Sequence, residues 1–351
     1  MLRLTIARSG SGIGCGVVHG RRTALSDSEA GPVALLLDRL RTVGHLPALP
    51  GLGPRVQRVT AIESQRTDEI AAHLLPDLAL SFELLRTINT AQVQGTQISG
   101  NGPVLTLRRV VALIGVDGVR LAANSLRDWP GPLEAAGATA LLAAIDRVRL
   151  AGHTAQALRP AGYDGEVVYL IAALQNLGPL MLRYHFAEEA EQIVQLMQPA
   201  PANGDGPRQP GLDRAAASYA VLGVDIETFG FAVARHWGLG DEILHMMRRL
   251  PAEAPVRKPD GDADLLRIVA SAANEIVDIA SDVPANKVSA ALDGVAQRYA
   301  RVLRLNTRAL VDALQEAKDV LRKGAATPAG RRKAEPAEAE PAVAVTPGEA
   351  R

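Results

Sequence analysis

Side chains that could hold a metal ion or transfer a proton are few in this sequence, and they are scattered. Only 7 of the 351 residues are histidines. His185, His236 and His245 are far apart along the chain, and a lone histidine without an oriented partner is seldom catalytic. We therefore expect these three to be half-buried or surface histidines.

Two close pairs of carboxylates could act as an acid and a base. They are Asp225 with Glu227, and Asp241 with Glu242. Residues this close in sequence do not share a helix face, whereas carboxylates at the start of a helix are stabilised by its dipole. We interpret both pairs as helix-start charges.

Neither a nucleophile nor a phosphate-binding loop is evident. Ser81, Ser125 and Ser218 lie in no nucleophile-elbow pattern. The single cysteine, Cys15, falls in a leader that reads RSGSGIGCGVVHGRR. Its glycines fit neither the G-x-x-x-x-G-K-[ST] nor the G-x-G-x-x-G spacing. We expect a flexible leader, or the remnant of a domain missing from this chain.

Composition narrows the class of protein. Lys+Arg and Asp+Glu balance at 38 each, so no overall field would gather nucleic acid or anionic membrane. A cysteine count of 1 excludes an internal disulfide framework and a thiolate zinc cluster. No apolar run reaches the ~18 residues of a membrane span, and the N-terminus lacks a signal-peptide pattern. We predict a soluble, cytoplasmic protein that binds neither nucleic acid nor membrane.

The elements that must position these residues are helices. Hydrophobic residues make up 47% of the chain but aromatic residues only 3%, which favours packed helices over a β-sandwich. Val33, Leu36 and Leu40 recur at the spacing of one helix face, and no alternation with a period of two is sustained anywhere. The predicted fold class is all-α, a multi-helix domain with a helical C-terminal extension.

Short helices are predicted in the first part of the chain. TDEIAAHLLPDLALSFELLRTINTA predicts two helices separated by Pro76, with Thr67 capping the first and Asp77 near the start of the second. The residues expected to face inward are Ile70, Leu74, Leu80, Leu84, Leu85 and Ile88. LTLRRVVALIGVDGVRLAANSL predicts two more, joined around Gly115 to Gly118.

Longer helices are predicted further on. One runs from Glu166 to Phe186, and two C-terminal helices run from Leu265 to Ile279 and from Asn286 to Lys323. In the last, apolar residues recur every three or four positions. We expect this stripe to pack on its own domain; a homodimer through the C-terminal helices is the alternative.

Changes in composition divide the chain into four parts. The tail is rich in Ala, Pro and Glu and is predicted to be disordered. The predicted parts are the leader at 1–31, a helical domain at 32–252 made of segments of about 32–130 and 131–252, C-terminal helices at 253–324, and the tail at 325–351.

An ordered series of segments carries a family resemblance. LPALPGLGPRVQRV, LLPDLALSFELLRTINTA and LRRVVALIGVDGVRLAA come first, followed by RLAGHTAQAL, LIAALQNLGPLML and LGVDIETFGFAVARHWGLGDEI. Their order and spacing resemble the HDOD family, relatives of HD-type metal phosphohydrolases found in bacterial signalling proteins. The resemblance covers roughly Leu40 to Leu250. It implies an HD-like helical fold, with Trp237 packed between core helices.

The resemblance also implies where a metal site would have been. HD-type helices carry adjacent His and Asp, and further histidines complete a site that activates water. His153 matches one family histidine, but Gln175 and Asn176 replace the His-Asp pair, and Ile226 stands at a downstream histidine. Amides neutralise no metal charge, so these four positions are interpreted as vestigial. We predict no catalytic residue, bound metal or cofactor.

The two amides can be interpreted in two ways. Gln175 and Asn176 are expected to join a buried hydrogen-bond network where the metal would have been. The alternative is that the old cavity still receives a small ligand such as a nucleotide.

For function, the leading hypothesis is a non-enzymatic regulatory module of a bacterial signalling pathway that acts through protein contacts. Kinase, receiver or cyclic-dinucleotide modules accompany such domains, so proteins of these kinds are the expected partners. Two alternatives stay open. One is a metal-dependent phosphohydrolase with a divergent ligand set, and the other is a regulator that binds a nucleotide without turnover.

Overall fold

All the regular elements that the structure describes are α-helices, which confirms the predicted fold class. The computed structural model describes residues 27–40, 44–61, 66–93, 104–199, 210–251 and 254–326. Our predictions for the leader before residue 27, Cys15 included, and for the tail after residue 326 lie outside the described residues.

The helices fall into three consecutive groups along the chain. The first comprises α1 (Asp27–Leu40), α2 (Leu52–Thr60), α3 (Thr67–Leu74), α4 (Leu78–Val93) and α5 (Leu107–Ser125). The second comprises α6 (Ala135–Leu158), α7 (Gly165–Leu174), α8 (Leu177–His185), α9 (Ala187–Met197), α10 (Arg214–Leu222), α11 (Ile226–His236) and α12 (Asp241–Met247). The third comprises α13 (Asp262–Asp282), α14 (Ala285–Leu303) and α15 (Thr307–Ala326).

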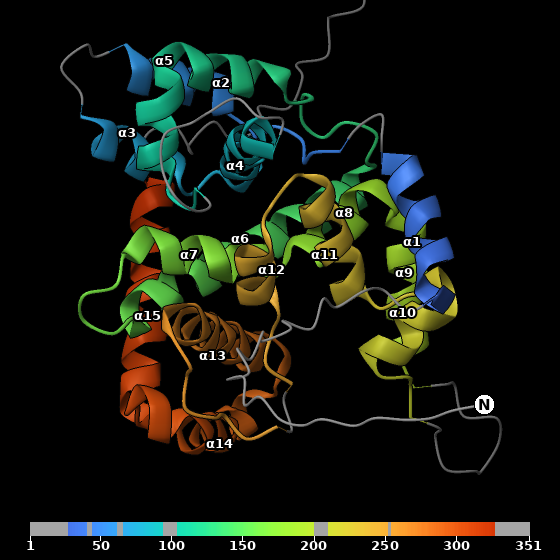
Figure 1. The fold of residues 1–351 in the computed structure, drawn as a ribbon. Coiled ribbons are helices and arrows are strands. Elements are labelled where there is room, and N and C mark those ends of the chain that lie inside the picture. Colours follow the sequence, from blue (N-terminus) through green and yellow to red (C-terminus); the bar gives the residue numbers. More distant parts are fainter. Residues whose placement is uncertain are drawn as a thin grey trace, which may run out of the picture.

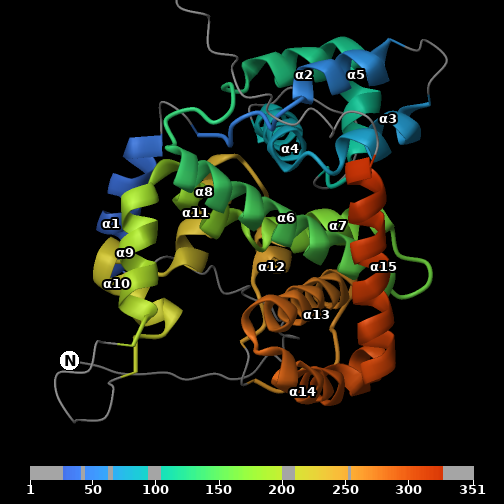
Figure 2. The same ribbon diagram turned by 180° about the vertical axis from the view of Figure 1, so that it is seen from behind.

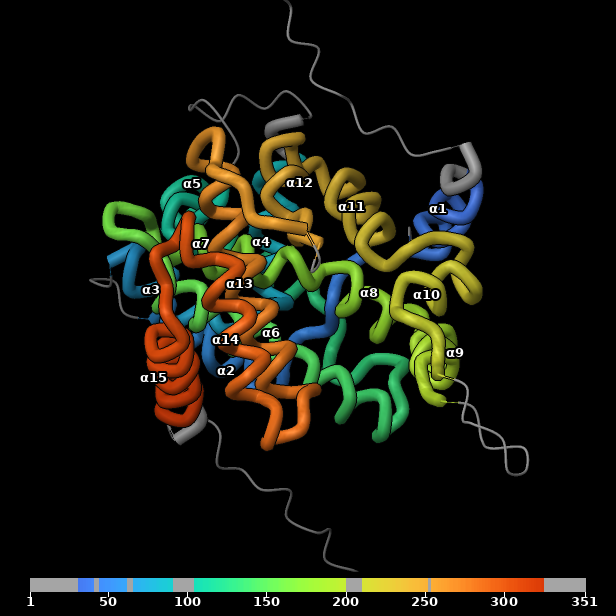
Figure 3. Tube along the Cα trace, turned by 90° about the horizontal axis from the view of Figure 1, so that it is seen from below, coloured from blue at the N-terminus to red at the C-terminus, as the bar shows by residue number. Residues whose placement is uncertain are grey.

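In space, α2 to α5 form a cluster above α6, α7, α8 and α11 (Figure 1). The helix α13 packs on α6 and α7 from the other side, and α15 packs against α6, which it crosses (Figure 2). The first helix, α1, lies apart from α2 to α5, beside α9 and α10 at the end of the molecule away from α15 (Figure 3). An ion pair between Arg39 and Glu189 joins α1 to α9.

The core is built mainly from aliphatic residues, in line with an aromatic content of only 3%. The residues of α3 and α4 that we expected to face inward are all buried: Ile70, Leu74, Leu80, Leu84, Leu85 and Ile88. Burying each such side chain contributes about 1.5–3 kcal/mol. The periodicity of these helices therefore predicted their packing faces correctly.

The boundary between α3 and α4 corrects one capping prediction. Thr67 is already the first helical residue of α3 and makes no cap; Arg66 precedes it, also without a side-chain cap. Asp77 does cap α4, because its Oδ1 accepts the Leu80 N–H at 3.2 Å. Gly115 bends α5 with a φ of 68°, so the predicted pair of helices is present as two segments joined by a kink.

The predicted helix from Glu166 to Phe186 is broken in two. Its parts, α7 and α8, are separated by Gln175 and Asn176 and bent by 48°. Pro179 has no N–H to donate to the carbonyl of Gln175, so a straight helix could not pass this point. The bend brings α8 against α11, where a Cβ on Gly178 would overlap the main-chain oxygen of Ile226.

The predicted helix from Asn286 to Lys323 is also broken. Arg304 takes the left-handed conformation with a φ of 53°, and Asn306 Oδ1 accepts the Ala309 N–H at 2.9 Å, which starts α15. The apolar stripe still packs on its own chain, since Leu292, Tyr299 and Leu310 are buried.

Trp237 packs between the first and second groups of helices and forms hydrogen bonds to the first. Its indole is 4% exposed and lies 6.3 Å from the ring of Phe82. Its Nε1 donates to Gly44 O at 3.0 Å, and its main-chain oxygen accepts from Thr90 Oγ1 at 2.7 Å. The predicted packing of Trp237 between core helices is confirmed.

No described helix, taken alone, combines the length and apolar character of a membrane span. Only α7 with α8, and α10 with α11, reach that length and composition, and they do so as bent pairs.

Candidate functional site

The break between α7 and α8 presents its two amides to α12 and α13. Gln175 ends α7 and Asn176 precedes α8. Because α13 lies across α7, the side chains of Ser271 and Asn274 come within hydrogen-bonding distance of these amides, almost a hundred residues away in sequence.

Gln175 is fully engaged. Its Nε2 donates to Met246 O at 3.0 Å and to Ser271 Oγ at 3.3 Å, and its Oε1 accepts from Asn274 Nδ2 at 3.0 Å. Gln175, Ser271 and Asn274 are only 6%, 4% and 2% exposed. Their polar atoms would be costly to leave unpaired, so this cluster orders the contact between α7 and α13.

The side chain of Asn176 is paired with an arginine of the same chain. Its Nδ2 donates to Ala172 O at 2.9 Å and to Asn274 Oδ1 at 2.7 Å. Its Oδ1 accepts a hydrogen bond from the guanidinium of Arg249. We call Gln175, Asn176, Arg249, Ser271 and Asn274 the amide network.

An ionic chain leads from the amide network to the surface. Arg249 also donates to Asp278 Oδ2 at 2.8 Å, and Arg147 binds Asp278 at 2.6 Å and Asp282 at 2.8 Å. Hydrogen bonds from Arg147 lower the pKa of Asp282. Each guanidinium in this chain is thus matched with carboxylates of α13.

The resemblance also singled out Ile226 and His153, which belong to different helices. Ile226 begins α11 and shares with Gln175 and Arg249 the wall of a cavity of about 190 Å³. His153 belongs to α6, with Nδ1 at 2.9 Å from Gln156 Oε1 and its ring edge-to-face with Tyr169. Burial lowers the pKa of His153. The structure therefore brings Gln175 and Ile226 to one cavity wall, whereas the partners of His153 are Gln156 and the ring of Tyr169.

The donor set does not fit a divalent metal. Across the described ranges, no group of three or more His, Cys, Asp or Glu side chains could hold a metal ion. The cation already bound to Asn176 would repel a second one, and amide oxygens do not neutralise metal charge.

The remaining histidines have structural surroundings. His185 Nε2 lies 3.1 Å from His45 O, and burial lowers its pKa to about 4, so it is neutral at physiological pH. His245 Nε2 pairs with Asp264 at 2.6 Å on the surface, and His236 is exposed.

The carboxylate pairs and the serines also play structural parts. Asp225 caps α11 by accepting the Thr228 N–H at 2.9 Å, while Glu227 accepts the Arg249 N–H at 2.7 Å. Asp241 and Glu242 lie in the first turn of α12, as predicted. The hydroxyls of Ser81, Ser125 and Ser218 each donate to main-chain oxygens.

Sequence reasoning missed the partners on α13. Arg267, Ser271, Asn274 and Asp278 recur at intervals of three and four along α13. This spacing places polar groups on one face of α13, and that face meets the amides. The spacing of these polar residues can be seen in the sequence, but only the packing of α13 on α7 shows that they face Gln175 and Asn176.

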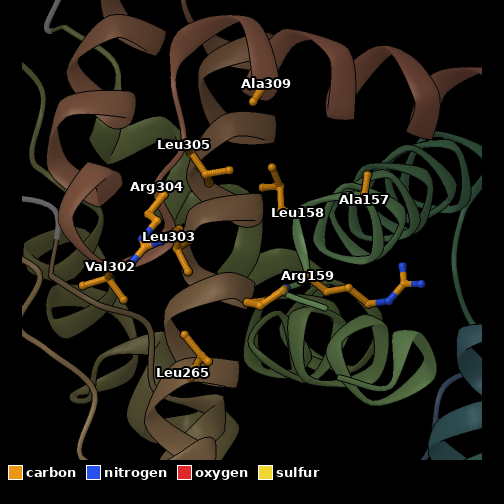
Figure 4. A pocket seen from close by; sticks show the side chains of 10 residues that line it. Ala157, Leu158, Arg159, Leu265, Val302, Leu303, Arg304, Leu305 and Ala309 are labelled. Carbon is orange, nitrogen blue, oxygen red and sulfur yellow. The ribbon is translucent and has the colours of Figure 1, made fainter. Parts of the chain in front are cut away.

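A second, larger cavity of about 460 Å³ lies where the end of α6, the start of α13 and the turn between α14 and α15 meet (Figure 4). Leu158, Leu265, Leu303 and Leu305 are among its walls. Its rim carries Arg159, whose guanidinium points away from the other labelled side chains. None of His153, Gln175, Asn176 and Ile226 lines it.

Solved structures share this fold. The MmoQ response regulator from Methylococcus capsulatus str. Bath is 16% identical, with a TM-score of 0.54, over 77% of this chain and 98% of that one. A virulence factor (cj0248) from Campylobacter jejuni subsp. jejuni is 14% identical, with a TM-score of 0.56, over 82% of this chain and 98% of that one. These identities show the fold alone. No curated protein is detectably similar in sequence.

The family is shown by a direct match. The model of the HDOD domain matches residues 46–251, which is more than half of the chain and includes the break between α7 and α8. The resemblance predicted nearly the same limits, Leu40 to Leu250. Because this match covers more than half of the chain, including Gln175, Asn176 and Arg249, the chain belongs to the HDOD domain family.

Proposed function

We propose that this HDOD domain is a non-enzymatic regulatory module that acts through protein contacts in a signalling pathway. One observation carries the proposal: the guanidinium of Arg249 donates to Asn176 Oδ1, at the position where the resemblance places a metal-binding carboxylate. A protein cation at this oxygen leaves neither the charge nor the donors for a catalytic metal.

The C-terminal extension supports the same reading. Ser271 and Asn274 belong to α13, which lies beyond the matched residues 46–251. They satisfy the amides that stand at the vestigial positions, so the extension consolidates the packing of the domain. The name response regulator, carried by MmoQ, favours a signalling role for domains of this fold.

Elemental analysis of the purified full chain, combined with phosphatase and phosphodiesterase assays in added Mn and Mg, tests the proposal. We expect metal well below one equivalent and no turnover. Arylphosphate monoesters and diesters serve as substrates because they report general phosphohydrolase activity. Metal near one equivalent, with turnover that is lost in both Gln175→Ala and His153→Ala, would overturn the proposal and establish a divergent phosphohydrolase.

The proposed partners are proteins with kinase, receiver or cyclic-dinucleotide modules, and a homodimer through the C-terminal helices is the alternative assembly. Deleting 265–323 would remove Asn274 from the amide network, so surface substitutions are the sharper test. Val311 and Val320 of α15 are 47% and 43% exposed. A two-chain mass by light scattering that falls to one chain in Val311→Asp and Val320→Asp would support the homodimer. A one-chain mass in the unaltered protein would favour partner proteins.

A further inference from the structure

The cavity of about 460 Å³ lies at the junction between the HDOD domain and the C-terminal helices. One wall is the end of α6, inside the matched residues 46–251, and the others come from α13, α14 and α15, which lie beyond them. Its volume falls within the ~300–1,000 Å³ of small-molecule sites. The cavity therefore depends on the C-terminal helices of this chain as well as on the HDOD domain.

The side chains that line this cavity are aliphatic, apart from two arginines. Leu158 faces Leu305 across it (Figure 4). Among the described residues, no carboxylate, amide, hydroxyl or aromatic side chain lines it, so it offers neither a stacking surface nor polar groups that would fix a nucleobase. The aliphatic residues are Ala157, Leu158, Pro160, Leu265, Val302, Leu303, Leu305 and Ala309.

The two arginines leave the interior of the cavity uncharged. The guanidinium of Arg159 points away from the other labelled side chains and donates to Gln156 O at 2.6 Å (Figure 4). Arg304 is exposed, so its charge stays in water. A water molecule needs about 2–4 polar partners to be well bound, whereas an apolar cavity favours an apolar occupant. The lining therefore favours hydrocarbon over water or a charged group.

The turn between α14 and α15 places two leucines at the cavity through an unfavourable backbone conformation. Among the described residues, Arg304 is the one non-glycine residue with a positive φ, of 53°. Its N–H donates to Ala300 O at 3.0 Å and so ends α14, and its neighbours Leu303 and Leu305 both line the cavity. Backbone strain of this kind collects at ligand-binding positions. Here it brings both leucines to one site.

We propose that this cavity binds a small molecule with an aliphatic chain, held by burial of that chain between α6, α13 and the turn from α14 to α15. Leu265, Leu303 and Leu305 are only partly buried, and the ligand would remove their remaining surface from water. It would contact the HDOD domain and the C-terminal helices at once. Binding to the folded state alone would therefore stabilise their packing.

This inference goes beyond the proposed function, since it gives the protein a chemical input. The cavity shares no lining residue with the amide network. A failure to bind aliphatic ligands would leave the metal and turnover tests unaffected, and bound metal or turnover would leave this cavity unaffected. The two proposals therefore fail separately.

A series of straight-chain primary alcohols tests the cavity on the full chain. Butanol, hexanol, octanol and decanol are titrated calorimetrically, each below its solubility limit. Every CH₂ that enters the cavity contributes about 0.8 kcal/mol, so the affinity should rise by up to about fourfold per carbon from butanol to octanol. The uncharged head group ensures that the arginines at the mouth do not produce this gain.

Two matched substitutions locate the binding. Ala309→Leu narrows the cavity and should weaken the affinity for octanol about tenfold, the effect of displacing roughly two CH₂ groups. Ala300→Leu adds the same atoms at an exposed position of α14 and should bind octanol as the unaltered protein does. Circular dichroism checks that each variant is folded, and Ala157→Leu narrows the cavity from α6 if Ala309→Leu is not. Absence of saturable binding of hexanol, octanol and decanol, or equal affinity for octanol in the narrowed and control variants, would overturn the proposal.

Discussion

Two buried polar centres of this domain differ in charge: one contains an acidic side chain, and the other is built around two uncharged amides. Between α3 and α4, the acidic side chain of Asp77 is 0% exposed, caps α4 and binds Arg55 at 3.0 Å. At the break between α7 and α8, Gln175 and Asn176 are neutral where the resemblance implies a charged metal ligand. A buried carboxylate needs donors and a counter-charge from the fold, whereas buried amides need only hydrogen-bond partners from neighbouring helices.

The donors to Asp77 do not fully offset its burial. Burial raises the pKa of Asp77, and the Leu80 N–H and the Arg55 charge oppose this rise. The amide network avoids that cost because its fully buried members are uncharged and its guanidinium lies at the edge, partly exposed. We therefore expect different changes in the free energy of unfolding when each centre is disrupted.

The largest effect is expected at the charged centre. Asp77→Ala removes the cap of α4 and the partner of Arg55, and should lower the free energy of unfolding by about 3–4 kcal/mol. Chemical denaturation measures this change. Asp117→Ala, at a side chain 95% exposed, is the matched control and should alter stability by less than about 0.5 kcal/mol. Equal effects of the two substitutions would show that the buried side chain of Asp77 stabilises the fold no more than an exposed carboxylate does.

His185 sharpens the comparison, because it is a titratable group that the fold keeps neutral. Its pKa is about 4 in the folded chain against 6.5 for an ordinary histidine, so between these values the unfolded chain binds the extra proton. Stability should therefore fall as the pH decreases from about 6.5 to 4, by up to about 3 kcal/mol. Denaturation midpoints over this range measure the slope. His185→Gln should flatten it, and His236→Gln, at an exposed histidine, should leave it unchanged.

The smallest of the three effects is expected in the amide network. Asn274→Ala leaves Gln175 Oε1 and Asn176 Nδ2 each short of a partner, and should cost about 2 kcal/mol. A double-mutant cycle with Gln175→Ala should show coupling of at least about 0.5 kcal/mol, since both side chains belong to one hydrogen-bond network. Strict additivity would mean that the two amides act independently. Asn286→Ala, at an exposed position of α14, is the control.

Local patterns accounted for much of the fold. The three- and four-residue spacing predicted the inward faces of α3 and α4, and Pro76 and Gly115 marked real interruptions. The two missed breaks had local signals as well. Pro179 lies four residues after Gln175, and Asn306 is a favoured residue for starting a helix. Apolar periodicity continued across both points and concealed them.

The sequence by itself determined that this chain is helical, that it resembles the HDOD family and that His and Asp are missing where a metal pair would stand. These are properties of residue types and of spacing along one segment. The tertiary structure alone decided which groups the two amides bind. Asn274 and Arg249 lie far from Asn176 in sequence, and they reach it because α13 packs across α7 and the chain after α12 turns back to the break. Contacts of this range depend on how helix faces meet in space, which no local spacing encodes.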